Sequence, residues 1–239
     1  MPREFETSNE FTVHATPQQV WDAIATGPGV DAWFMGRTEI EPGTSVRTEF
    51  PGGFTLESAV SEWDPPHRLA YRAEPQENGE FHAFEFLVEG REGSTTTVRM
   101  VHSGALANWD DEFDAMREGD ALYAGKLAAY LEHFAGRPGR SFFAQQEKDG
   151  DRAAVMSAVR TQLGVPGDAA VGDRVQVAPD GMEPLDGVID LAAPHVLGVR
   201  ADDALLRVFH GMGTLVVEEH RYGGAAPRVW QGWLDRLSA

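Results

Sequence analysis

Among the side chains of this sequence that could do chemistry, His102 is the one whose spacing turns it inward. Val98, Met100 and His102 alternate along one strand-like segment and therefore share one face. An inward imidazole can act as a general acid or base if a carboxylate or a substrate lies within hydrogen-bond reach. The same pattern arises when a strand-end histidine is satisfied by the backbone or by solvent, so we assign no catalytic residue.

No group of residues in the sequence has the spacing of a known metal-binding or phosphate-binding motif. Glu80 and His82 lie two apart on one strand face, and Glu218-Glu219-His220 alternates between faces, but neither has a third ligand at a recognised distance. The glycines of Gly211-Met212-Gly213 are followed by no Gly-Lys-Ser, and no serine stands in a Gly-x-Ser-x-Gly elbow. The sequence contains no cysteine, which excludes disulfides and thiolate chemistry. We therefore predict no metal ion and no cofactor.

One segment occurs twice, about 128 residues apart. Asp64-Pro65-Pro66-His67-Arg68-Leu69-Ala70-Tyr71-Arg72 reappears as Ala192-Ala193-Pro194-His195-Val196-Leu197-Gly198-Val199-Arg200. Each copy follows a Gly-led strand signal and a second apolar strand. A chance strand opener would give a similar match, but the repeat favours two related halves.

The elements that would position these residues are strands enclosed by helices. Thr16-Pro17 starts a helix, Gly27-Pro28-Gly29 breaks it, and 30–34 forms a short second helix. In the first half, strands are expected at 5–14, 45–50, 54–63, 68–73, 80–89 and 95–102, before a long helix that ends near Phe134. The second half repeats the order in shorter form, with strands at 141–146, 173–178, 185–191, 195–201, 204–210 and 214–222. A helix follows Asp151, and a last helix at 226–237 places Val229, Trp230, Trp233, Leu234 and Leu237 on its apolar face.

This order resembles that of a known family. The residues that carry the resemblance are Val20-Trp21-Asp22-Ala23-Ile24, Trp33-Phe34, the link Glu62-Trp63-Asp64-Pro65-Pro66-His67-Arg68-Leu69 and the closing strand Thr97-Val98-Arg99-Met100-Val101-His102-Ser103-Gly104. They are similar to the START-like (SRPBCC) superfamily, and within it to bacterial relatives of the heat-shock protein 90 ATPase activator C-terminal domain. The resemblance covers 4–136 well and 141–238 weakly.

The resemblance implies an α+β helix-grip fold, a curved antiparallel sheet around a long C-terminal helix, present as two tandem related halves. We expect a START-like domain at 1–136, a linker at 137–140 and a shorter, degenerate START-like half at 141–239. The fold implies a cavity for an apolar ligand in the first half. The expected ligand-binding residues are Trp33, Phe34, Phe84, Phe86, Val98, Met100, His102, Tyr123, Leu127 and Tyr130.

Three functions fit this reading. We favour non-catalytic binding of a small apolar ligand; a protein-interaction module like the chaperone activator and a cyclase-like enzyme are the alternatives. The net charge of −18 disfavours nucleic acid and anionic membranes as partners, since both require clustered basic residues. No apolar run is long enough to span a bilayer and no signal peptide is visible, so we expect a cytoplasmic protein, with a protein partner or a homodimer left open.

Overall fold

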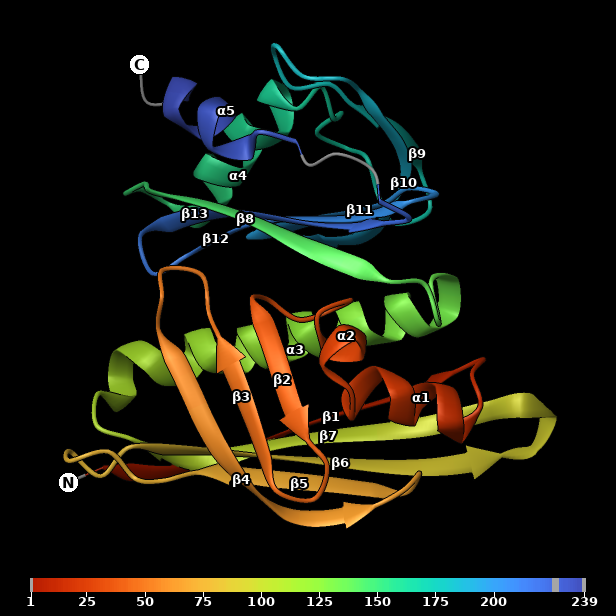
Figure 1. Ribbon diagram of the computed structural model, residues 1–239. Helices are drawn as coiled ribbons and strands as arrows, with labels where there is room; N and C mark the ends of the chain where they lie inside the picture. Colours follow the sequence, from red (N-terminus) through yellow and green to blue (C-terminus); the bar gives the residue numbers. More distant parts are fainter. Residues whose placement is uncertain (1, 225–227, 238–239) are drawn as a thin grey trace. The chain divides into compact units, whose positions relative to one another are not determined.

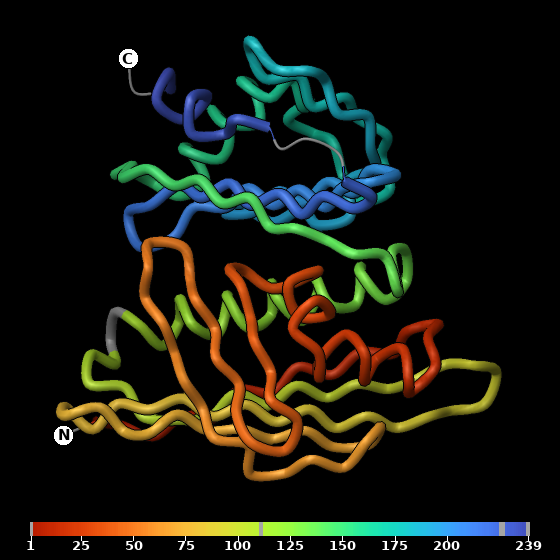
Figure 2. The backbone as a smooth tube through the Cα atoms, in the orientation of Figure 1, coloured from red at the N-terminus to blue at the C-terminus, as the bar shows by residue number. Residues whose placement is uncertain are grey.

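The computed structural model describes residues 2–224 and 228–237, without the side chains of residues 110 and 111 (Figures 1 and 2). The chain divides into two compact units, residues 1–139 and 140–239. Each unit has one antiparallel sheet. No helix in the described part of the chain combines the length and the apolar character needed to cross a membrane.

The first unit is a curved sheet that holds a long helix. Its strand order is β1-β7-β6-β5-β4-β3-β2. Figure 1 shows α3 lying across one face of this sheet, with α1 and α2 on the same side. The elements are β1 (Arg3–Val13), α1 (Pro17–Ile24), α2 (Gly27–Val30), β2 (Arg37–Glu41), β3 (Ser45–Glu49), β4 (Thr55–Asp64), β5 (Arg68–Ala73), β6 (Phe81–Arg91), the short turn η1 (Glu92–Ser94), β7 (Thr95–Leu106) and α3 (Trp109–His133). This is the helix-grip fold.

Local signals explain the first two helices. The Thr16 side chain accepts a hydrogen bond from the Gln19 backbone, and the Gln19 side chain returns one to the Thr16 backbone, which is a capping box. Thr26 caps α2 in the same way by accepting from Gly29 N. The first helix ends at Ile24, before Gly27 as expected, but the second helix is at Gly27–Val30 and not at 30–34. Pro28 stands in the first turn, where a proline costs no helical hydrogen bond, so this segment is itself the second helix.

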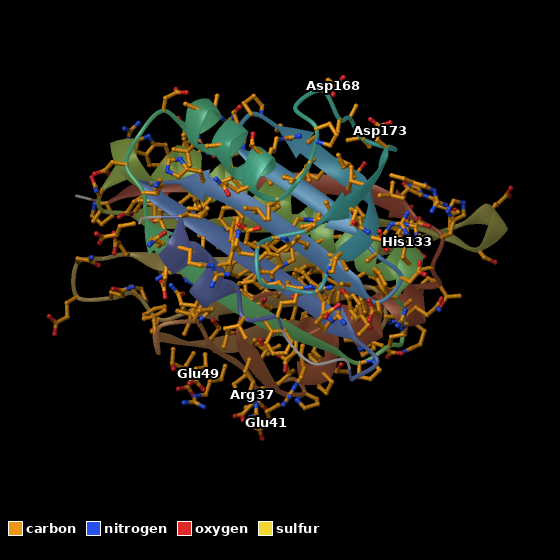
Figure 3. The ribbon with its side chains drawn as sticks, turned by 90° about the horizontal axis from the view of Figure 1, so that it is seen from above. Arg37, Glu41, Glu49, His133, Asp168 and Asp173 are labelled. Carbon is orange, nitrogen blue, oxygen red and sulfur yellow. The ribbon has the colours of Figure 1, made fainter. Side chains whose placement is uncertain are left out.

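Strand β2 was not predicted, because only Ile40 in it is a large apolar residue. Asp31, just after α2, accepts a hydrogen bond from Thr38 N (2.7 Å) and so helps to fix the start of the strand. The strand lies at the edge of the sheet, where charged side chains hinder pairing with another chain. Arg37, Glu41 and Glu49 point outward from this edge (Figure 3).

The second unit has the same strand order with one strand fewer, β8-β13-β12-β11-β10-β9. Its elements are β8 (Gly139–Glu147), α4 (Arg152–Gln162), β9 (Arg174–Val177), β10 (Leu185–Ala193), β11 (Val196–Arg200), β12 (Ala204–Gly211), β13 (Thr214–Tyr222) and α5 (Trp230–Arg236). Both units therefore begin with a strand that pairs with their last strand, followed by an antiparallel meander. The two tandem halves are present as expected.

The repeated segment occupies equivalent places in the two units. His67 lies in the turn between β4 and β5, and His195 lies in the turn between β10 and β11. The carbonyl of His67 accepts from Val88 N, and that of His195 accepts from His210 N, both at 2.9 Å. Common descent of the second unit as a degenerate copy remains a prediction.

Two boundaries differ from expectation. Strand β8 begins at Gly139, so two of the four residues expected in the linker belong to a strand. Helix α5 begins at Trp230, later than predicted, and residues 226 and 227 lie outside the described residues. Val229 was assigned to the apolar face of this helix but is its N-cap and 73% exposed, because the chain there has not yet turned onto the core.

Candidate ligand-binding cavity

A cavity of about 310 Å³ lies in the first unit between the sheet and α3. All of its lining residues fall between Ile24 and Tyr123. Most of them are apolar or aromatic, and the polar exceptions are few. This volume is at the lower end of the range of known small-molecule sites.

The floor of the cavity is set by strand register. Thr7, His102, Phe84 and Tyr71 pair directly opposite one another on β1, β7, β6 and β5. Directly opposite residues point to the same face of a sheet, so this row lies across the concave side. Phe86 and Met100 form the next row and also line the cavity.

The N-terminal half of α3 provides the opposite wall. Met116, Gly119, Asp120 and Tyr123 line the cavity. Their spacing of three, four and seven residues places them on one face of the helix. A Cβ atom built on Gly119 meets no atom within 4 Å, so this position borders open space.

Aromatic side chains form one side of the cavity. The ring of Phe34 lies 4.7 Å from that of Tyr123 and 6.0 Å from that of Phe50, and Phe54 continues the cluster while remaining 57% exposed. Trp33 is buried, and its indole N–H donates to the Ala23 carbonyl at 2.9 Å. These rings provide an apolar entrance at the surface of the unit.

The polar end of the cavity is a chain of hydrogen bonds. Asp120 lies 2.9 Å from Nδ1 of His102 through Oδ1, and Nε2 of His102 lies 3.0 Å from Nδ1 of His82. The hydroxyl of Thr7 donates to the other oxygen of Asp120. All three members of the Asp120–His102–His82 chain line the cavity.

The partners determine which nitrogens carry protons. An ionised carboxylate only accepts, so the Nδ1 of His102 donates to Asp120. When His102 is neutral, its Nε2 accepts and the Nδ1 of His82 donates to it. Nε2 of neutral His82 is left with a lone pair, and no residue that the structure describes hydrogen-bonds to it.

Packing holds both imidazoles in place. Phe84 stacks on His102 with ring centroids 4.1 Å apart, and Phe5 meets His102 edge-on at 5.0 Å. Gly104 pairs with both Phe5 and His82, and a Cβ there would lie 3.0 Å from the Phe5 ring. The missing side chain at Gly104 therefore leaves room for this arrangement.

The surroundings shift the pKa of His82 downward. Burial is the largest cause, since it disfavours the charged imidazolium, and the neighbouring His102 adds to it. The carboxylates of Glu80 and Asp120 oppose the shift. His82 is therefore a neutral base at physiological pH.

Tyr71 supplies a second polar atom to the cavity. Burial raises the pKa of its hydroxyl, so the group stays protonated. Within the described residues nothing hydrogen-bonds to this hydroxyl, which leaves it free to donate to a ligand. Tyr71 pairs with Phe84, two residues beyond His82 on β6, so Tyr71 and His82 are diagonal neighbours on the concave face.

Seven of the ten predicted ligand-binding residues line the cavity: Trp33, Phe34, Phe84, Phe86, Met100, His102 and Tyr123. Val98, Leu127 and Tyr130 are buried but lie outside the lining. Val98 pairs with Phe11 and Val88, farther along the sheet from the polar end, and Leu127 follows the lining stretch of α3. The Tyr130 hydroxyl accepts from Gly136 N in the turn that ends α3.

Sequence reasoning missed Asp120, Tyr71 and the pairing of His82 with His102. Asp120 was not among the expected site residues, and it follows several acidic residues on α3. Its spacing from Met116 and Tyr123, both apolar on one helix face, was the available signal. His82 was considered only with Glu80, whose carboxylate instead accepts from Ala107 N at 2.8 Å and from the Asn78 side chain.

The histidine chain is not arranged as a metal site. The ring nitrogens of His102 face Asp120 and His82 and do not converge on a common centre. Across the described ranges, no group of three or more metal-binding side chains is placed to hold an ion.

Several solved structures are similar to this chain. DynU16, described as a putative protein in the dynemicin biosynthetic locus, is 18% identical with a TM-score of 0.47, and the match covers 97% of this chain and 92% of that one. The Aha1 dimer from Colwellia psychrerythraea is 20% identical with a TM-score of 0.43, over 54% of this chain and 96% of that one. A Mesorhizobium loti protein is 18% identical with a TM-score of 0.47, over 53% and 96%. A search of the curated proteins found no match.

These identities and TM-scores are too low to carry an argument about function. The family assignment rests on a family model, described as activator of Hsp90 ATPase homolog 1-like protein, that matches residues 14–132. The matched residues run from the end of β1 to the last turn of α3 and include the cavity lining. The first unit belongs to the family of activator of Hsp90 ATPase homolog 1-like proteins.

Proposed function

We propose that the first unit binds a small, largely apolar molecule in the cavity between its sheet and α3. The observation that carries this proposal is the cavity itself, about 310 Å³ between the sheet and α3. Protein interiors are normally packed without voids of this size, because unfilled space costs stability. A retained cavity is therefore expected to have a use.

The chemistry of the lining defines the ligand. The aromatic rings of Phe84, Phe86 and Phe34 favour a flat or bulky apolar body. Thr38 and Thr48 also line the cavity, but their hydroxyls pair with each other, whereas His82 and Tyr71 at the polar end each offer an unused hydrogen-bonding atom. The ligand should therefore be apolar over most of its surface and carry one polar group, typical of a cyclic or aromatic ketone, phenol or amide.

The family name suggests activation of a chaperone through a protein–protein contact. That function would need an exposed apolar surface, whereas the exposed part of the lining described above is its aromatic entrance at Phe54. We therefore place ligand binding first.

The test is a fluorescence titration with phenylnaphthylamine, a neutral apolar fluorophore that brightens when water is excluded. Gly119→Leu adds a side chain to the α3 wall of the cavity, at a position where a Cβ meets no atom within 4 Å. The matched control is Gly125→Leu on the same helix, where a Cβ also meets nothing within 4 Å but the position is exposed and outside the lining.

We expect the wild type and Gly125→Leu to bind the fluorophore alike, and Gly119→Leu to bind at least about tenfold more weakly, since one lost apolar contact site is worth about 1.4 kcal/mol or more. Equal binding by Gly119→Leu, or no binding by the wild type, would contradict the proposal.

A further inference from the structure

The polar end of the cavity holds two reactive atoms that the fold leaves unused. They are Nε2 of His82 and the hydroxyl of Tyr71, neither of which hydrogen-bonds to any residue in the described part of the chain. Both residues are half-buried and line the cavity, so a ligand there can pair with them. A binding site for a purely apolar molecule would need neither.

The two atoms differ in chemistry. His82 is a neutral base with its lone pair available, and the His102–Asp120 pair behind it holds its other nitrogen as a donor. Tyr71 is a protonated hydroxyl and so a donor. A base and a donor on diagonal positions of adjacent strands lie roughly 7–8 Å apart at their backbones, which leaves room for one functional group between them.

A carbonyl group with a hydrogen on the adjacent carbon fits this pair. Its oxygen accepts from Tyr71, and its α-hydrogen is the proton that His82 would remove. We propose that the first unit catalyses proton transfer at the carbon next to the carbonyl of a bound apolar ketone, with His82 as general base and Tyr71 as hydrogen-bond donor to the developing enolate.

The step balances without any other reactant. The α C–H bond breaks, its electron pair moves into the new carbon–carbon double bond, and the carbonyl π electrons move to the oxygen that Tyr71 stabilises. The proton goes to Nε2 of His82. Return of a proton to the same carbon gives exchange, and return to another carbon of a conjugated ketone gives isomerisation.

His102 and Asp120 are positioning residues in this scheme. When His82 gains a proton, its Nδ1–H still donates to His102, whose own Nδ1–H still donates to the Asp120 carboxylate. The negative charge of Asp120 therefore favours the imidazolium formed at His82, as a buried carboxylate does behind a catalytic histidine. The other charged group that acts on His82 is Glu80.

This inference rests on the proposed binding function, and the experiment separates the two. The probe is β-tetralone, an apolar bicyclic ketone with an acidic C–H. Its binding is measured by displacement of phenylnaphthylamine, and its catalysed exchange by loss of the α-proton signal in deuterium oxide, each for the full-length chain.

We expect the wild type to accelerate exchange, His82→Gln to lower the protein-dependent rate by about 10²–10⁴-fold, and Tyr71→Phe to lower it by about 10²–10³-fold, with binding retained in both. The matched control is His14→Gln, which removes a second histidine–carboxylate pair, His14 with Glu132, whose histidine is 80% exposed. It should exchange like the wild type.

Asp120→Asn distinguishes a positioning role from a purely structural one. The rate should rise with pH as His82 loses its proton, and removing the carboxylate charge should move the midpoint of this profile to lower pH while lowering the plateau. Binding without protein-dependent exchange, or exchange unaffected by His82→Gln, would overturn the acid–base inference and leave ligand binding standing. Binding of phenylnaphthylamine without displacement by β-tetralone would also overturn only the acid–base inference, whereas absence of binding of either molecule would overturn both.

Discussion

At the scale of single residues, Asp120 is the buried carboxylate at the polar end of the cavity. It is 8% exposed although it follows several acidic residues on α3. Thr7 and His102 both donate to it, so its burial is compensated by hydrogen bonds from two strands. The carboxylate therefore links the helix to the sheet at the polar end of the cavity.

Removing this carboxylate should destabilise the first unit. Asp120→Ala leaves the Thr7 hydroxyl and the His102 N–H buried without their acceptor, which costs about 1–3 kcal/mol for each group left unsatisfied. We expect the free energy of unfolding of the first unit to fall by about 2–4 kcal/mol in urea. Asp114→Ala, at an exposed position on the same helix, is the control and should change it by less than about 0.5 kcal/mol. A similar small change at Asp120 would show that the network is not formed.

His82 gives the stability of the first unit a pH dependence. Its pKa is lowered in the folded state, so the unfolded chain binds the proton first as the pH falls. The stability contributed by neutral His82 is fully present above about pH 6.5, the usual histidine pKa, and is lost as the pH falls through the lowered folded-state value. Glu80, whose pKa is also lowered, acts only below its usual value of 4.5.

Between pH 7 and pH 5 we therefore expect the melting temperature of the wild type to decrease more than that of His82→Gln. Parallel curves for the wild type and His82→Gln would contradict the burial of this imidazole.

At the scale of elements, alternation and capping were sufficient for most of the fold. The alternation of Val98, Met100 and His102 correctly predicted the inward face of β7, and Thr16-Pro17 correctly predicted the start of α1. Strand β2 was not predicted from the sequence, because edge strands lack the apolar alternation of central strands. The second short helix was expected at 30–34 but lies at Gly27–Val30, because glycine and proline signal turns unless the capping geometry is known.

The site was harder to predict than the fold, because its key contacts depend on register. His82 and His102 are diagonal neighbours only if Phe84 pairs with His102, and a one-residue slip would separate them. The register between β6 and β7 cannot be predicted from the alternation of residues in the sequence. Whether the Asp120 side chain faces the sheet depends in addition on the rotation of α3 about its axis. The acidic residues before Asp120 on the helix gave no sign of this orientation in the sequence.

The core of the second unit tests the packing of its helix α5. Trp233 is 2% exposed and packs with Trp230 and the apolar face of the sheet. Trp233→Ala should lower the free energy of unfolding of this unit by about 3–5 kcal/mol, through lost transfer energy and the cavity left behind. Val229→Ala, at a 73% exposed position, is the matched control and should change it by less than about 0.5 kcal/mol. A loss below about 1 kcal/mol for Trp233→Ala would show that α5 is not packed as described.

At the scale of the whole molecule, the two units share one strand order but differ in how their cores are filled. The first unit has seven strands and a long closing helix that leave a cavity, whereas the second has six strands and a short closing helix. Large side chains such as Met156, Leu163 and Trp233 fill the second core. A chain with two related units therefore needs a measurement that reports on both at once.

The methionine methyl groups provide that measurement. The sequence has seven methionines. Met35, Met100 and Met116 line the cavity of the first unit. Met156, Met182 and Met212 belong to the second unit and serve as internal controls. In a spectrum of isotope-labelled methionine methyls, each group reports separately on a ligand nearby.

On titration with β-tetralone or phenylnaphthylamine, we predict that the Met35, Met100 and Met116 signals shift together in a saturable way, while the second-unit signals remain in place. Gly119→Leu should abolish these shifts. Saturable shifts at Met156, Met182 or Met212 without shifts at the first three, or no saturable shift at all, would contradict the claim that the first unit holds an apolar ligand in its cavity.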